Sequence, residues 1–356
     1  MSIPYRLYFN EMTFQNPRTQ NLDQSIVKSA TSTKVHSASR PFDRRKLVIG
    51  RKLAIRLTSG LMALGLSLGS ALPTVAADPF RANTSTATHD IGPLTERAFQ
   101  AIFKEGNYIE AKRYLAEAQT AESEEPLVHA MLASMSYLSG DLPAVNASAI
   151  ATKNAAETLK AADPLRGHLY SAVGTFLQGA YILKTEGVAK GTPAALGMLQ
   201  QVFSELDEAE SINPSDPELN LIKGYMDLML AVNLPFSNPE GAISQMSTYG
   251  SPVYLTQRGI ALGYRDLQEY GKAIEAVDQA LAIAPENPEL IYLKAQVLAK
   301  QGAQADSTAL FQQALAYADQ LPTSLVKQMT WERCLAEGIA NAEQCKVQRN
   351  AAEGAF

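Results

Sequence analysis

The chain has 356 residues, of which 46% are hydrophobic, and this content excludes a disordered protein and allows one large or two ordinary domains. Its formal charge of −5 hides an asymmetry, because residues 1–77 carry 11 basic and 3 acidic side chains while the remainder carries 20 basic and 33 acidic ones. Since phosphate neutralisation needs clustered lysine and arginine, the acidic remainder argues against a nucleic acid as partner.

The first 77 residues have the pattern of a leader peptide that is removed. A basic run ends at Arg56, and an uncharged stretch follows whose apolar centre, Leu61–Leu72, is twelve residues long. Small residues close this stretch at Ala77, directly before Asp78. The order is typical of a secretory signal peptide, and we expect cleavage between Ala77 and Asp78. Because a spanning helix needs roughly 20 apolar residues, we expect no stable membrane span after cleavage.

The leader predicts export, and we expect the mature protein to be soluble in the periplasm. The stretch 25–39 carries seven serine and threonine residues and no acidic residue. This composition is also typical of an organelle transit peptide, so the thylakoid lumen or another lumenal compartment is the alternative. Residues 78–91, which contain several small polar residues, are expected to form a flexible linker.

Residues 92–321 are predicted to form a series of helix pairs. The segment Ile212–Leu219 returns as Ile283–Leu290, 71 residues later, which is about two units of 34 residues with a small insertion. A shift of 34 residues also pairs small residues with each other: Ala261 with Ala295, and Ala280 with Ala314. Fixed periods of this length are the signature of a helical solenoid. No stretch alternates with a period of two, so we expect no sheet.

The unit over residues 254–287 resembles a tetratricopeptide repeat (TPR). It carries the small and large residues of that family at matching positions of its two helices: Ile260, Ala261, Tyr264, Ala273, Val277, Ala280 and the closing Pro285. Unit 288–321 is similar, the two units that begin at residue 92 match in part, and the middle units match least. The resemblance implies an all-α, right-handed α-solenoid of about six TPR-like helix pairs over 92–321, followed by a helical extension over 322–356.

Residues at the predicted helix ends agree with this architecture. Gly106, Gly140 and Gly302 stand where a positive φ is needed to end a helix. Asp216-Pro217-Glu218 and Asn287-Pro288-Glu289 each supply an N-cap, a proline at the first helical position and a carboxylate near the positive end of the helix dipole. A single helix pair cannot bury its apolar face alone, so we expect the pairs to stack.

The resemblance implies that a partner binds on the concave face, which the first helix of each unit lines in this family. The matching positions are predicted to bind a peptide or protein partner: Phe103, Tyr137, Tyr225, Arg258, Leu262, Arg265, Tyr292 and Gln296. Arg258 and Arg265 lie two turns apart on one helix, and fixed guanidinium donors suit an acidic partner segment. The alternative is an intramolecular pair of these arginines with Asp266 or Glu269.

The mature chain shows no sequence pattern that predicts catalysis or metal binding. Its three histidines, His89, His129 and His168, are far apart, and neither an HExxH nor a GxSxG motif occurs. We therefore predict no enzyme activity, no metal and no cofactor. The predicted function is a scaffold for protein–protein interaction, with the assembly or maintenance of an envelope or lumenal complex as its setting.

Two other functions stay open at this point. Hydrolases and lyases with an α/α-toroid fold are also built from helix pairs, but their sites usually use aromatic platforms. The single tryptophan of this chain, Trp331, follows the repeats. The second alternative is a self-assembling structural module, in which one end of the solenoid docks onto another copy of the chain.

Cys334 and Cys345, the only two cysteines, are predicted to form a disulfide in the C-terminal extension. Export would place both residues where thiols oxidise. Gly338 and Asn341 lie between them as turn residues, and a chain reversal there would bring the two Cα atoms within the roughly 4.4–6.8 Å that a bridge requires. The alternative is one unbroken helix, which would hold the sulfurs about 16 Å apart at a rise of 1.5 Å per residue.

Overall fold

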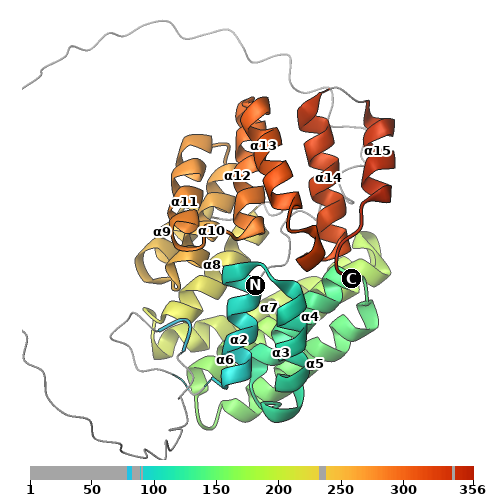
Figure 1. Ribbon diagram of the computed structural model, residues 1–356. Coiled ribbons are helices and arrows are strands. Elements are labelled where there is room, and N and C mark those ends of the chain that lie inside the picture. Colours follow the sequence, from blue (N-terminus) through green and yellow to red (C-terminus); the bar gives the residue numbers. More distant parts are fainter. Residues whose placement is uncertain (1–77, 82–88, 90, 232–237, 339–340) are drawn as a thin grey trace, which may run out of the picture. The chain divides into compact units, whose positions relative to one another are not determined.

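The chain forms an all-α solenoid (Figure 1). The computed structural model describes these parts of it: 78–81, 89, 91–231, 238–338 and 341–356. They contain fourteen α-helices, and no strand occurs within these ranges, so the predicted fold class is confirmed. None of the helices in these ranges has both the length and the apolar character that crossing a bilayer requires. The leader, with Ala77 on one side of the expected cleavage site, lies outside the described residues.

Successive helices pack against each other as six pairs, and two further helices follow. The first helix, α2 (Pro93–Phe99), continues directly as a π-helical turn, η2 (Gln100–Glu105). The pairs are, in order, α2 and η2 with α3 (Tyr108–Ala121), α4 (Pro126–Ser139) with α5 (Leu142–Leu159), α6 (Pro164–Glu186) with α7 (Val188–Ile212), α8 (Pro217–Ala231) with α9 (Pro239–Tyr249), α10 (Val253–Asp266) with α11 (Tyr270–Ile283), and α12 (Pro288–Gln301) with α13 (Gln304–Leu315). The short 3₁₀ turn η3 (Ala318–Gln320) then leads to α14 (Thr323–Glu337) and α15 (Ala342–Ala351).

The helix starts use the capping chemistry that the sequence predicts. Asn287 Oδ1 accepts hydrogen bonds from the backbone N–H groups of Glu289 and Leu290 at 2.9 and 3.2 Å. Asp216 Oδ1 likewise accepts from the N–H of Leu219 at 3.0 Å. The glycines expected at helix ends adopt positive φ angles in the structure: Gly106, Gly140 and Gly302. Local sequence therefore sets where these helices begin and end.

The stacked helix pairs share a hydrophobic core of alternating small and large side chains. The alanines of the repeat are fully buried where helices approach each other: Ala261, Ala280, Ala295 and Ala314. Val277 and Phe311 fill the space opposite and are also buried. Tyr264 and Leu298, the other large residues of the pattern, are half-buried. The close approach of the helices thus follows from small residues facing large ones.

The first helix pair contacts the sixth as well as its own neighbour. Asn287 Nδ2, at the start of α12, donates hydrogen bonds to the carbonyl oxygens of Phe103 and Lys104 in η2, both at 3.1 Å. Gly106, which ends η2 with a φ of 65°, faces Pro288, and a Cβ at Gly106 would lie 2.6 Å from Pro288 Cδ. Glycine therefore permits both the backbone conformation and the close approach of the two pairs.

The C-terminal extension contains the predicted disulfide. The sulfurs of Cys334 on α14 and Cys345 on α15 are bonded at 1.99 Å, and the two Cα atoms are 5.5 Å apart. Gly338 ends α14 with a φ of 65°, and Asn341 caps α15 by accepting a hydrogen bond from the N–H of Gln344. The chain reverses between the two cysteines, so the alternative of one unbroken helix is wrong.

Candidate functional site

Asp78–Arg81, called here the N-terminal segment, is buried against the helix pairs. Phe80 and Arg81 are each 1% exposed, and Asp78 is fully buried. Asp78 forms a turn, because its Oδ1 accepts from the N–H of Phe80 at 2.9 Å and its carbonyl oxygen accepts from the N–H of Arg81 at 3.1 Å. The structure corrects the expectation of a flexible linker over 78–91 for these four residues, since an apolar and a cationic side chain both find buried partners. Residues 82–88 and 90 lie outside the described residues.

Phe80 lies against the inner face, which is the face formed by the first helices of the pairs. Its ring centroid is 4.9 Å from that of Phe99 on α2, edge to face, and Phe99 is in turn 4.7 Å from Phe103 on η2. Side chains of α2, η2, α4, α8 and α10 surround this point: Phe99, Phe103, Leu127, Ala130, Met131, Ser134, Leu221, Ile222 and Leu255. The cavity left beside Phe80 measures only about 10 Å³. The Phe80 ring therefore fills the place where four helix pairs meet.

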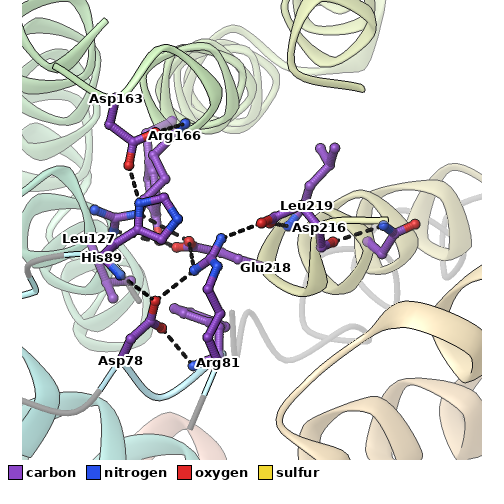
Figure 2. Close-up of polar contacts among 12 residues, drawn as sticks. Asp78, Arg81, His89, Leu127, Asp163, Arg166, Asp216, Glu218 and Leu219 are labelled. Atoms are coloured by element: carbon purple, nitrogen blue, oxygen red, sulfur yellow. Dashed lines mark hydrogen bonds and ion pairs between the residues drawn. The ribbon is translucent and has the colours of Figure 1, made fainter. Parts of the chain in front are cut away.

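Arg81 points into an acidic pocket at the starts of three first helices (Figure 2). The acidic pocket consists of residues at the starts of α4, α6 and α8: Glu125, Arg166, Asp216 and Glu218. The Arg81 guanidinium donates from one terminal nitrogen to Asp216 Oδ2 at 2.6 Å. Its other terminal nitrogen donates to Glu218 Oε2 at 3.1 Å and to Asp78 Oδ2 at 2.8 Å. The guanidinium is thus bonded to three carboxylates.

Glu218 is the centre of the acidic pocket. Arg166 Nε donates to Glu218 Oε2 at 3.0 Å, while its two terminal nitrogens donate to the Glu125 carboxylate at 3.0 and 2.8 Å. The Tyr170 hydroxyl donates to Glu218 Oε1 at 2.7 Å. Burial by itself raises the pKa of Glu218, but the positive charges of Arg166 and Arg81 outweigh burial and hold this pKa below its ordinary value. The buried carboxylate is therefore ionised and paired with two cations.

His89 joins the N-terminal segment to the start of α6. Its backbone N–H donates to Asp78 Oδ2 at 3.1 Å, and its Nδ1 is hydrogen-bonded to Asp163. Asp163 also caps α6, because its Oδ1 accepts from the N–H of Arg166 at 3.1 Å. Burial raises the pKa of Asp163, but the hydrogen bonds from His89 and from the helix start hold it below its ordinary value. Across the described ranges, no group of three or more His, Cys, Asp and Glu side chains is arranged to hold a metal ion.

The eight residues predicted to bind a partner lie mainly inside the protein. Five are buried: Phe103, Arg258, Arg265, Tyr292 and Gln296. Three are half-buried: Tyr137, Tyr225 and Leu262. Phe103 lies close to Phe80, and Arg258, Arg265 and Gln296 lie on the first helices α10 and α12. Their role in binding a partner stays a prediction.

Arg258 and Arg265 both form contacts within the chain. A terminal nitrogen of Arg258 donates to Glu289 Oε2 at 2.5 Å. Arg265 Nε donates to Asp266 Oδ1 at 2.9 Å, and one of its terminal nitrogens donates to Gln296 Oε1 at 2.8 Å. The intramolecular pair with Asp266, left open by the sequence, is therefore present, and an acidic partner would have to compete with these buried contacts.

The sequence predicts neither the burial of the N-terminal segment nor the acidic pocket. Phe80 and Arg81 stand alone in a polar stretch without periodicity, so no pattern marks them. One usable signal is a charged residue next to a proline at the start of a first helix, which occurs repeatedly: Glu125-Pro126, Asp163-Pro164 and Asp216-Pro217-Glu218. Stacking of the pairs brings such starts together, and a cluster of carboxylates there needs a cation.

Comparisons with known proteins add little to this site. No known protein family matches the chain, and no curated protein matches it. Among solved structures, the chain is similar to PilW, described as a widely conserved type IV pilus biogenesis factor. The match covers 64% of this chain and 90% of that chain, with 17% sequence identity and a TM-score of 0.41. The similarity concerns the helical fold and carries no information on the N-terminal segment.

Proposed function

We propose that this protein is a non-enzymatic scaffold that binds a peptide or protein partner on its inner face. The supporting observation is that the inner face accommodates a short non-helical stretch of polypeptide, the N-terminal segment. Phe80 fills an apolar site between first helices, and Arg81 is bonded to carboxylates at helix starts. A buried aromatic anchor next to a desolvated arginine is the kind of contact that dominates the energy of protein interfaces.

The proposed location is an exported compartment, either the periplasm or a lumen. Two features support it: the pattern of a signal peptide before Asp78 and the Cys334–Cys345 disulfide. Structural disulfides persist in oxidising compartments and are rare in the cytosol. The proposed role there is the assembly or maintenance of an envelope or lumenal complex.

Photo-crosslinking in the native host tests the proposed partner-binding face. A photoreactive amino acid replaces the half-buried Tyr137 or Leu262, two of the positions predicted to bind the partner. The matched control replaces Ile150 on α5, a second helix, where the side chain is 41% exposed. We expect one defined adduct from Tyr137 or Leu262 and none from Ile150. An adduct that forms only from Ile150 would contradict the proposal, because the partner would then bind the opposite side of the pairs.

A further inference from the structure

The acidic pocket contains more carboxylates than cations, and Arg81 of the N-terminal segment is a second cation that is bonded to two of these carboxylates. Three carboxylates line the pocket, those of Glu125, Asp216 and Glu218, and Arg166 is the one cation among the pocket residues. Arg166 turns its terminal nitrogens toward Glu125 and its Nε toward Glu218. Asp216 Oδ2 is bonded to Arg81 instead. Because buried carboxylates without a counter-charge are strongly unfavourable, the pocket requires a second cation.

The geometry of the pocket favours a guanidinium as that second cation. The two terminal nitrogens of Arg81 reach two pocket carboxylates at once, at 2.6 Å to Asp216 and 3.1 Å to Glu218. A guanidinium presents its donors in a rigid planar fork, so it can bond to several carboxylates in fixed directions. An ammonium group is a single point charge on a flexible stem and suits this arrangement less well. The geometry of the pocket therefore fits the arginine side chain better than that of lysine.

The apolar site and the acidic pocket are adjacent, and neighbouring residues occupy them. Phe80 and Arg81 are consecutive, and the turn formed by Asp78 directs their side chains to the two sites. The N-terminal segment is not part of any helix, and the side chains of Phe80 and Arg81 make the contacts described here with the inner face and the acidic pocket. A segment of another chain with the same two side chains can make the same contacts.

We propose that the inner face and the acidic pocket together recognise a polypeptide segment in which an aromatic residue is followed directly by arginine. The N-terminal segment is an intramolecular occupant of this site and competes with such a partner. This inference rests on the proposed function, because it names the partner class of the same face. A partner must displace Phe80 and Arg81, so its apparent affinity equals its intrinsic affinity multiplied by the fraction of molecules in which the site is vacant.

A peptide-binding experiment with a vacated site tests this inference. The probe is a fluorescent peptide with the sequence of residues 78–83, and the protein is the exported chain with Phe80→Ala and Arg81→Ala. We expect the double variant to bind the peptide at least about tenfold more tightly than the wild type, since its site is vacant. A peptide with alanine in place of its arginine, or of its phenylalanine, should bind at least about tenfold more weakly. Adding Asp216→Asn to the double variant should weaken binding of the unchanged peptide.

A second variant keeps the test decisive if the double variant does not fold, as judged by circular dichroism. Arg81→Lys retains Phe80 and a positive charge, and it should bind the peptide more tightly than the wild type does. The inference is overturned if neither variant binds the peptide more tightly than the wild type. If the crosslink from Leu262 then still forms, the proposed function stands and the partner is recognised by other chemistry. If the variants bind the peptide but no crosslinked partner is found, the site binds only the chain's own N-terminal segment. That result would contradict the proposed competition with a partner.

Discussion

The starts of α8 and α12 carry the same sequence pattern but bind different groups. Glu218 and Glu289 each follow a proline, 71 residues apart, and both are buried. Each carboxylate accepts a hydrogen bond from a tyrosine hydroxyl and one from an arginine: Glu218 from Tyr170 and Arg166, and Glu289 from Tyr108 and Arg258. The repeat has thus produced the same kind of buried ionic site twice.

The difference between the two sites lies in the residue before the proline. Asp216 Oδ2 accepts a hydrogen bond from Arg81, whereas Asn287 Nδ2 donates to the carbonyl oxygens of Phe103 and Lys104. Both side chains also cap their helices through Oδ1. A carboxylate has only acceptors, while an amide has one acceptor and a donor group. The residue before the proline therefore binds a cation at the start of α8 and backbone carbonyls at the start of α12.

The largest effect is expected from removing the charge of Glu218. Glu218→Gln keeps the shape of the side chain but leaves Arg166 and Arg81 without their shared carboxylate, so we expect a loss of about 3–5 kcal/mol in the free energy of unfolding. Glu289→Gln is the matched variant, and its loss should be smaller because this carboxylate is bonded to the single guanidinium of Arg258. Urea denaturation of both variants measures the difference. Equal losses would show that the second guanidinium contributes nothing.

A smaller effect is expected from Asn287→Asp, which makes the start of α12 like that of α8. The variant keeps the cap acceptor but loses the donor to the carbonyls of Phe103 and Lys104, and we expect a loss of about 1–3 kcal/mol in the free energy of unfolding. Asn213→Asp serves as the control. Asn213 also precedes a proline and is half-buried, and an aspartate retains its acceptor to the N–H of Ser215. Thermal and urea unfolding should show little change for this control. A similar loss in both variants would mean that the carbonyl contacts are unimportant.

The reciprocal variant, Asp216→Asn, should loosen the N-terminal segment more than the whole fold. It retains the cap to Leu219 but loses the negative charge bonded to Arg81. A hydrogen bond to a charged group contributes roughly 1.5–3 kcal/mol to stability. We expect trypsin to cleave after Arg81 about tenfold faster than in the wild type, because cleavage follows the population of the open segment. Mass spectrometry of the released fragment measures the rate. Arg113, which is half exposed on α3, provides an internal reference site. An unchanged ratio of the two rates would contradict the role of Asp216.

The smallest effect is expected in the dependence of stability on pH. Arg166 and Arg81 outweigh burial and hold the pKa of folded Glu218 below its ordinary value of 4.5. Its stabilising contribution is therefore complete above pH 4.5 and is lost as the pH falls through the folded pKa. The gap in stability between the wild type and Glu218→Gln should be constant from about pH 6 to pH 4.5 and should narrow between pH 4.5 and about pH 3. A gap that stays constant over this range in urea titrations would refute the ionised state of Glu218.

The predictions from sequence succeed where near neighbours interact. The caps of Asp216 and Asn287 act within three residues of each helix start. The disulfide joins cysteines that are separated by 11 residues, with Gly338 and Asn341 in the intervening reversal. The repeat extends such local signals along the chain, because each unit buries its apolar side against the next one.

The prediction of an open partner face shows where such reasoning stops. The resemblance to the TPR family assigns Phe103, Arg258 and Tyr292 to one side of the first helices, and they lie on first helices as expected. It says nothing about what covers that side. The contact between η2 and the start of α12, made by Asn287, brings the first and sixth pairs together, and these three residues are buried.

By itself, the sequence determined the helix pairs, their caps and the cysteine bridge, because each depends on residues within one repeat unit or one turn. Only the tertiary structure decided the place of the N-terminal segment and the composition of the acidic pocket. Arg81 and Glu218 are 137 residues apart, and no sequence pattern near either residue indicates that the two are in contact. A buried charge is tolerated only when an opposite charge is held beside it, and that pairing exists only once the starts of α4, α6 and α8 are stacked together.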